Sequence, residues 1–311
     1  SWSVAGAQPL SLRHLAAGAA CIAANFGCRP TFALSALLCF PIFWPQITSL
    51  LQGLKSRSLP PRRALRAPAA VIIPALIVVL PLMAYNVARF GSPLDFGNDY
   101  QMTVTDMTRF VQPTANFLPS VGAYLFLPLR FTSEFPFIGM TPIAFREWGY
   151  YELMAGGLFA TCPLLLLALA APFLRRRMHR SGYWGLATCS LALAVLLAVF
   201  DSHTAGLGWR YICDFGWMMA IAALAPMLYL MHPGGDAIAA GAPDPSERNE
   251  PRRDVTKRHP MVLACVRGLV VAVLMASIIL AVLACFIPGR DDSLINNNPV
   301  LYDTAVAWFR L

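Results

Sequence analysis

The sequence predicts an all-α fold: a polytopic transmembrane helical bundle of about seven spans, with an outer interfacial helix. Three observations predict it. Hydrophobic residues make up 57% of the 311 residues and charged residues only 13%, whereas a soluble domain carries roughly 25% charged residues. The apolar residues form long runs, and the basic residues lie in short clusters between those runs. Such a composition is typical of membrane proteins.

A transmembrane helix needs about 20 mostly apolar residues. Proline within such a run is tolerated, because neighbouring helices satisfy the freed backbone groups. Segment 116–131 is apolar but too short to cross, so we expect it to lie at the outer interface. The predicted spans are residues 15–28, 31–51, 67–87, 153–174, 182–200, 213–231 and 261–287.

Three basic clusters predict the orientation of the spans. Cytoplasmic loops of membrane proteins carry an excess of Lys and Arg, so we expect the N-terminus of this chain to be cytoplasmic and its C-terminus to be outside. The same rule accounts for the net charge of +8, and no nucleic-acid partner is predicted. The clusters are Lys55, Arg57, Arg62, Arg63 and Arg66; Arg175, Arg176, Arg177 and Arg180; and Arg248, Arg252, Arg253, Lys257 and Arg258.

The chain divides into four predicted parts. Residues 1–232 form transmembrane helices with a long outer loop at 88–152. Residues 233–260 are rich in Pro, Gly and charged residues and are predicted to be a disordered cytoplasmic loop. Residues 261–287 form the last transmembrane helix, and residues 288–311 form an outer C-terminal tail.

The common signatures of soluble enzymes are absent from the sequence. It contains no P-loop, GxGxxG, HExxH or GxSxG pattern, so no cofactor is predicted. The eight cysteines include no CxxC pair, and most lie inside apolar runs. They therefore predict neither a metal site nor a disulfide framework.

Polar residues at the outer end of the third span form one candidate site. Arg89 is followed by Asp95 and Asp99 in the stretch NVARFGSPLDFGNDYQ. These residues either form a polar pocket at the membrane surface or act as an interfacial anchor, with the arginine snorkelling to water. Two carboxylates can also contribute to a divalent-cation site, but such a site needs further ligands.

The short loop before the sixth span forms a second candidate site. Arg210 and Asp214 are four residues apart at the start of a helix, so they share a helix face. They form a structural ion pair, or Arg210 offers its planar guanidinium to a phosphate. Arg29, in the turn between the first two spans, also falls at the outer boundary, where an arginine snorkels, pairs or binds an anion.

Three stretches resemble bacterial membrane glycosyltransferases of the GT-C type. LAAGAACIAANFGCRPTFAL is similar to their G-x-x-x-G-L-A-x-x-x-R-P-T segment, with Ala and Asn where Gly-Leu is usual. NVARFGSPLDFGNDYQMT resembles N-Y-x-R-F-G-S-P-x-E-F-G-x-x-Y-Q-L, the most specific of the three, and GLGWRYICDFGW resembles G-x-x-W-R-Y-x-x-D. The matched stretches lie between residues 15 and 217.

The resemblance implies an enzyme that moves a sugar from a polyprenyl-phosphate carrier to an acceptor at the outer face of the bacterial plasma membrane. The family's catalytic carboxylate lies in its first outer loop, and no part of this sequence matches that loop. The catalytic residue is therefore unassigned, and the chain is expected to correspond to a C-terminal portion. The candidate substrate-binding residues are Arg29, Arg89, Asp95, Asp99, Tyr100, Gln101, Arg210, Tyr211 and Asp214.

Two other functions stay open. A lipid or sugar transporter or flippase predicts ionisable residues near the middle of its spans, and the spans here are almost free of charge at their centres. A non-catalytic membrane subunit would assemble through faces of small residues such as 19–24. If the sequence upstream of Ser1 also lacks an acidic first outer loop, the non-catalytic subunit is favoured over the enzyme.

Overall fold

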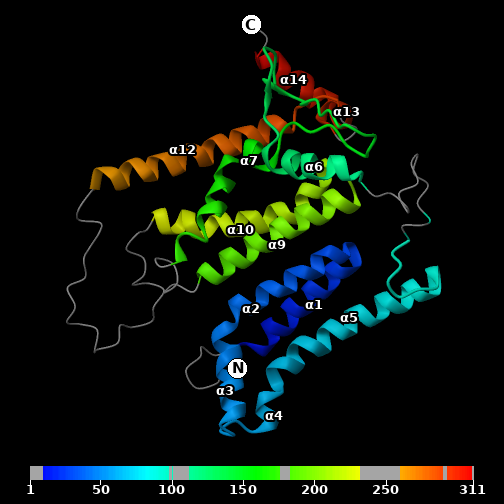
Figure 1. The fold of residues 1–311 in the computed structure, drawn as a ribbon, viewed down its shortest axis with the longest axis vertical. Coiled ribbons are helices and arrows are strands. Elements are labelled where there is room, and N and C mark those ends of the chain that lie inside the picture. The colour runs from blue at the N-terminus through cyan, green and yellow to red at the C-terminus, as the bar shows by residue number, and fades with distance from the viewer. Residues whose placement is uncertain are drawn as a thin grey trace. The chain divides into compact units, whose positions relative to one another are not determined.

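The computed structural model describes residues 10–97, 100, 112–175, 183–231, 260–289 and 293–309. These residues form helices, together with one short hairpin, and the chain divides into two compact units (Figure 1). Unit 1 is Ser1–Phe110 and unit 2 is Val111–Leu311. The predicted cytoplasmic loop, 233–260, lies almost wholly outside the described residues.

Unit 1 is built on two helices that run in the same direction. The first, α1, ends where Arg29 adopts an extended backbone before Pro30, a conformation that proline imposes on the residue preceding it. It packs closely on α5, since a Cβ at Gly27 would lie 2.9 Å from the Leu82 side chain. The elements are α1 (Leu12–Cys28), η1 (Pro30–Leu38), α2 (Cys39–Ile42), α3 (Trp44–Lys55), α4 (Pro61–Ala64) and α5 (Arg66–Phe90).

The second predicted span, 31–51, is a bent pair of helices. A 3-10 segment continues into α2, and α3 leaves at 67° after a break at Phe43. Pro41 and Pro45 flank this break, and each lacks the N–H group that a continuous helix would use. Prolines were expected to be tolerated within this span. In the structure, these two prolines lie at the bend, so the span is not one straight helix.

Unit 2 centres on the antiparallel pair α9 and α10, which bury small and flexible apolar side chains against each other. Ala194, Leu197, Met218 and Ala222 are fully buried there, and small residues let membrane helices approach closely. The elements are α6 (Thr114–Phe126), β1 (Arg130–Phe131), β2 (Ile138–Gly139), α7 (Leu158–Thr161), η3 (Pro163–Ala170), α9 (Tyr183–Thr204), η5 (Trp209–Tyr211), α10 (Ile212–Met231), α12 (Pro260–Ala284), α13 (Leu294–Asn297) and α14 (Pro299–Phe309).

The predicted span 153–174 is not one continuous helix. Its helical parts are α7 and the 3-10 segment η3; Cys162 separates them, and η3 begins at Pro163. Gly157 is pressed against α6, because a Cβ there would lie 2.6 Å from the Leu127 backbone nitrogen. The Ser277 hydroxyl of α12 accepts a hydrogen bond of 3.1 Å from the Leu164 N–H group. Tertiary packing thus breaks a segment whose hydropathy alone predicted a span.

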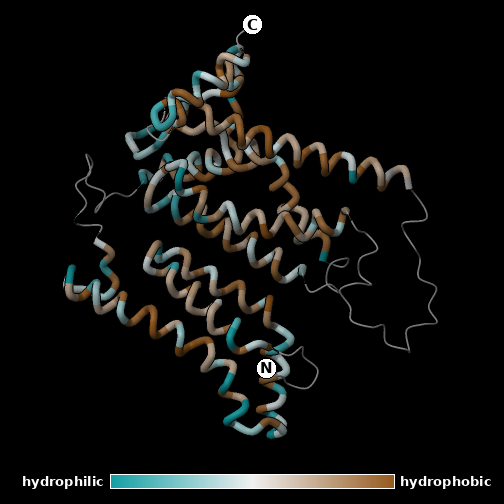
Figure 2. The backbone as a smooth tube through the Cα atoms, turned by 180° about the vertical axis from the view of Figure 1, so that it is seen from behind, coloured by the Kyte–Doolittle hydropathy of each residue, from teal (hydrophilic) through white to brown (hydrophobic). Residues whose placement is uncertain are grey.

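Several helices are long and apolar enough to cross a membrane. Among the described residues there are four, or five if the bent pair in unit 1 is one span. Their hydrophobic residues form long brown stretches in Figure 2. The α-helical class and the presence of membrane-length apolar helices are therefore confirmed, while the number seven stays a prediction. The four helices are Arg66–Phe90, Tyr183–Thr204, Trp209–Met231 and Leu263–Ala284.

Candidate functional site

The connection between α9 and α10 is held in place by one buried tyrosine. The Tyr124 hydroxyl donates to the Gly206 carbonyl and accepts from the Gly208 N–H group, both at 2.9 Å. Its ring is fully buried and contacts the edge of Phe215. Gly206 has a φ of +79°, and a Cβ there would lie 2.5 Å from the Tyr150 carbonyl oxygen. The connection therefore needs glycine at this position and has a defined shape.

Glu152 lies against this connection and binds its backbone and its side chains. The Glu152 N–H group donates to the Leu207 carbonyl at 2.7 Å, and the Leu207 N–H group donates to Tyr150 at 3.0 Å. Carboxylate atom Oε2 accepts from the Trp209 N–H group at 2.9 Å. The other atom, Oε1, accepts from the Tyr150 hydroxyl at 2.7 Å. A carboxylate from the end of the long loop therefore fixes the start of the sixth predicted span.

Arg210 forms an ion pair with this carboxylate. Its Nη2 atom lies 3.4 Å from Glu152 Oε1 and 3.4 Å from the Tyr150 hydroxyl oxygen. Within the described part of the chain, Nε and Nη1 of Arg210 make no hydrogen bond, and the side chain is 62% exposed. One edge of the guanidinium is thus held by the protein, and the other edge is available to an anion.

The electrostatic environment keeps Tyr150 protonated. Burial raises the pKa of its hydroxyl, and the hydrogen bond to Glu152 and the negative charge of that carboxylate raise it further. Tyr150 therefore stays a neutral donor to a more alkaline pH than an ordinary tyrosine does. Its hydroxyl donates to the carboxylate that also pairs with the Arg210 guanidinium.

The remaining residues of the Arg210 segment take different places. Tyr211 lies under the Arg210 guanidinium, with the carbon Cζ 5.6 Å from its ring centre. Asp214 is buried in the first turn of α10, but it is not the ion-pair partner of Arg210. Of the two alternatives for Arg210, an ion pair with Asp214 or a phosphate contact, the first is not what the structure shows: the ion-pair partner is Glu152, from a distant part of the chain.

Among the described residues, the contacts of Arg89 are with its own end of α5. Its Nη1 atom donates to the Tyr85 hydroxyl at 2.9 Å, and its Cζ atom lies 5.1 Å from the Phe90 ring centre. Asp95 accepts a hydrogen bond of 2.8 Å from the Gly97 N–H group, so its carboxylate closes a local turn. Arg89 and Asp95 therefore lie near one another in the chain without forming an ion pair.

The other unit 1 candidates gather around the same end. Tyr100 stacks on Phe90, with ring centres 5.3 Å apart. Phe26, in the last turn of α1, contacts the edge of the Phe96 ring at 5.3 Å, so Arg29 lies at the end of unit 1 that also carries Arg89. Asp99 and Gln101 lie outside the described residues.

Three residues of the unit 2 cluster, Tyr124, Tyr150 and Glu152, were absent from the predicted site. An acidic residue directly before an apolar run is costly at a membrane boundary, and that cost was the available signal. Nothing in the sequence pattern shows that the Tyr124 hydroxyl would form hydrogen bonds with Gly206 and Gly208, beside the residues that contact Glu152.

Across the described residues, no group of three or more His, Cys, Asp or Glu side chains is placed to hold a metal ion. No protein family, curated protein or solved structure matches the chain. The fold and composition define a class, a protein with apolar helices able to cross a membrane. The resemblance to glycosyltransferases stays a prediction.

Proposed function

We propose that the protein takes part in transferring a sugar from a polyprenyl-phosphate carrier at the outer face of a bacterial plasma membrane, and that Arg210 binds the carrier phosphate. The observation that supports this is the half-held guanidinium, fixed along one edge by Glu152 and Tyr150 and exposed along the other. A fork held in this way can pair with two phosphate oxygens.

The depth of Arg210 suits a lipid-linked phosphate. It lies in the first turn of Trp209–Met231, a helix long and apolar enough to cross a membrane. A residue at the end of such a helix lies near the lipid headgroups, where cationic side chains meet phosphates. The sugar and its acceptor would then be outside the hydrocarbon region.

Glu152 changes what kind of recognition is expected. Because the carboxylate neutralises much of the Arg210 charge, the pair offers little net positive potential to an anion. Recognition must therefore rely on the direction of the guanidinium N–H groups more than on charge. Lysine, which keeps the charge and loses the fork, would replace Arg210 poorly.

A role in donor binding is also proposed for the predicted residues of unit 1. Arg29 and Arg89 lie at one end of unit 1 together with Asp95 and Tyr100. In the proposed topology this end also faces outward, so these residues would contact the carrier headgroup or its sugar.

The proposal keeps the seven-span topology and places α6 at the outer interface. One face of α6 is buried through residues such as Asn116 and Tyr124, while Leu118 and Phe126 are exposed. Exposed apolar residues beside a polar buried face suit a helix lying between headgroups and hydrocarbon. Single-cysteine labelling in intact cells with an impermeant reagent tests the map: position 92 should label and position 178 should not. Strong labelling at 178 would contradict it.

Transfer itself is tested with the full-length protein in proteoliposomes. A polyprenyl phosphate with a radiolabelled sugar is supplied as donor, with membrane extract as acceptor. We expect label to leave the lipid, and we expect Arg210→Ala to slow this strongly while Arg130→Ala, an exposed arginine of the same unit, does not. Movement of intact labelled lipid between leaflets without loss of the sugar would support the transporter or flippase instead.

A further inference from the structure

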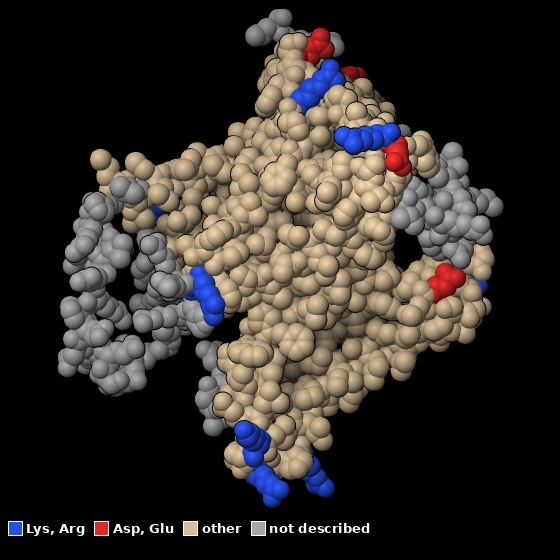
Figure 3. Space-filling model, in the orientation of Figure 1, with Lys and Arg blue, Asp and Glu red and all other residues tan. Residues whose placement is uncertain are grey.

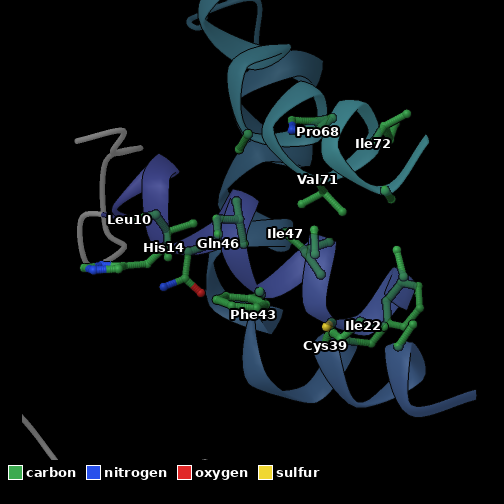
Figure 4. A pocket seen from close by; sticks show the side chains of 18 of the residues that line it. Leu10, His14, Ile22, Cys39, Phe43, Gln46, Ile47, Pro68, Val71 and Ile72 are labelled. Atoms are coloured by element: carbon green, nitrogen blue, oxygen red, sulfur yellow. The ribbon is translucent and has the colours of Figure 1, made fainter. Parts of the chain in front are cut away.

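Unit 1 contains an apolar cavity that the proposed function does not use. Its volume is about 710 Å³, and it lies between α1, the bent α2–α3 segment and the first half of α5. Figure 4 shows Ile47 and Val71 pointing toward one another across it, with Phe43 beside them. Ligand pockets commonly enclose roughly 300–1,000 Å³, so this cavity has the size of a binding site for a hydrocarbon chain.

One polar group in the cavity lacks a partner. The side-chain oxygen Oε1 of Gln46 is buried and, among the described residues, accepts no hydrogen bond. Gln46 and His14 are the polar side chains in a lining that is otherwise apolar. A buried amide oxygen without a donor is unfavourable, and a ligand with a hydroxyl or amide near its apolar chain would relieve it.

The charge near one end of the cavity is strongly positive. Ala67 and Pro68 line the cavity and directly follow Arg66. Lys55 in the last turn of α3 and Arg62 in α4 belong to the same basic connection and are exposed. Figure 3 shows Lys and Arg side chains at the α3–α4 end of unit 1. The first acidic residue of the chain is Asp95, so no acid from residues 1–94 offsets these charges.

We infer that the cavity binds an anionic glycerophospholipid of the bilayer, with an acyl chain between α1, α3 and α5 and the phosphate against Arg62 and Arg66. The apolar lining suits the chain, the Gln46 oxygen suits a hydroxyl of the headgroup, and Arg62 and Arg66, with no acid among residues 1–94, select a negative headgroup. This site is separate from the Arg210 cluster, and it does not depend on the proposed transfer function.

The test is lipid binding by the purified full chain, measured by native mass spectrometry. Phosphatidylglycerol and phosphatidylcholine with identical acyl chains are titrated in turn. We expect phosphatidylglycerol to bind more tightly, and Arg62→Gln with Arg66→Gln to remove that preference, roughly fivefold for each basic residue. Arg130→Gln, in unit 2, is the matched control and should leave the preference unchanged.

A second variant tests the cavity itself. Ala75 lines it, and Ala75→Phe should weaken both lipids by about tenfold, as expected if two methylene groups of the chain lose their place. Ala264→Phe, at an exposed position of α12, is the control. Equal affinity of the wild-type protein for the two lipids would overturn the inference without any variant.

Discussion

Arg89 in unit 1 and Arg210 in unit 2 both lie at the end of a membrane-length helix, but different parts of the chain hold them. Arg89 donates to Tyr85, four residues earlier on its own helix. Arg210 contacts Tyr150, sixty residues away, and Glu152. An arginine whose partner lies on its own helix moves with the end of that helix. An arginine whose partners lie far away in the sequence is held in place relative to the rest of its unit. The comparison suggests that Arg210 is the better prepared of the two to recognise a ligand.

The largest expected effect comes from Tyr124, which supports the Arg210 cluster. Tyr124→Ala should lower the free energy of unfolding of unit 2 by about 3–5 kcal/mol, because it removes a fully buried aromatic ring. Tyr124→Phe should cost about 1–3 kcal/mol, because it leaves the Gly206 carbonyl and Gly208 N–H groups buried without partners. Denaturant unfolding in detergent measures both. Tyr85→Phe, which affects the exposed Arg89 contact, should be nearly neutral; an equal loss there would break the comparison.

A substitution of Gly206 tests whether the connection between α9 and α10 requires a positive φ at this position. Gly206→Ala should destabilise the protein by about 1–3 kcal/mol, because its positive φ is unfavourable for alanine and the added Cβ would meet the Tyr150 carbonyl. Gly122→Ala on α6 is the control, since a Cβ there meets nothing within 4 Å, and it should stabilise by about 0.4–1 kcal/mol. Thermal unfolding distinguishes them, and similar shifts for both variants would rule out a strained connection.

A substitution of Glu152 tests the contacts that hold the connection between α9 and α10. Glu152→Gln keeps the shape but removes the charge, and its NH₂ group replaces one of the two acceptor oxygens, so it meets either the Trp209 N–H group or the donors of Tyr150 and Arg210. The expected cost is about 1–2 kcal/mol, since the pair is partly exposed to water. Faster amide hydrogen exchange at residues 205–211 should accompany it. Unchanged exchange would show that Tyr124 alone fixes the connection.

The smallest effect concerns pH. Because the pKa of Tyr150 is raised above its ordinary value near 10, the associated stability is fully present below pH 10 and is lost as pH rises through the raised pKa. Tyr150→Phe should flatten this alkaline loss in the unfolding curve. An identical pH profile in wild type and variant would indicate that Tyr150 ionises normally.

Elements governed by local composition were predictable from the sequence. The apolar runs at 67–87 and 213–231 appear as continuous helices, α5 and α10, because hydropathy and helix length are properties of a single segment. Segment 153–174 is not one continuous helix, for one tertiary and one local reason: Gly157 packs against the end of α6, and Pro163, at the start of η3, lacks the N–H group that a continuous helix would use.

The candidate site shows the same division. Arg210 and Tyr211 were found from the residues around them, but the only protein partner considered for Arg210 was Asp214, the nearest acid on the same helix face. Glu152 could not be preferred from the sequence, because its place depends on the pairing of Tyr151 with Leu207 and on the buried hydroxyl of Tyr124. Long-range contacts of this kind leave no local pattern.

The most direct measurement is the affinity of the full-length protein for a polyprenyl phosphate when Arg210 is replaced by Lys or by Ala. If the guanidinium fork holds the phosphate, both variants should bind roughly ten- to a hundredfold more weakly, the value of a lost charge-assisted hydrogen bond, while Arg130→Ala binds as the wild type does. If Arg210→Lys binds normally, the fork is not used. Unchanged affinity in Arg210→Ala would contradict the phosphate site and leave Arg210 as a structural partner of Glu152.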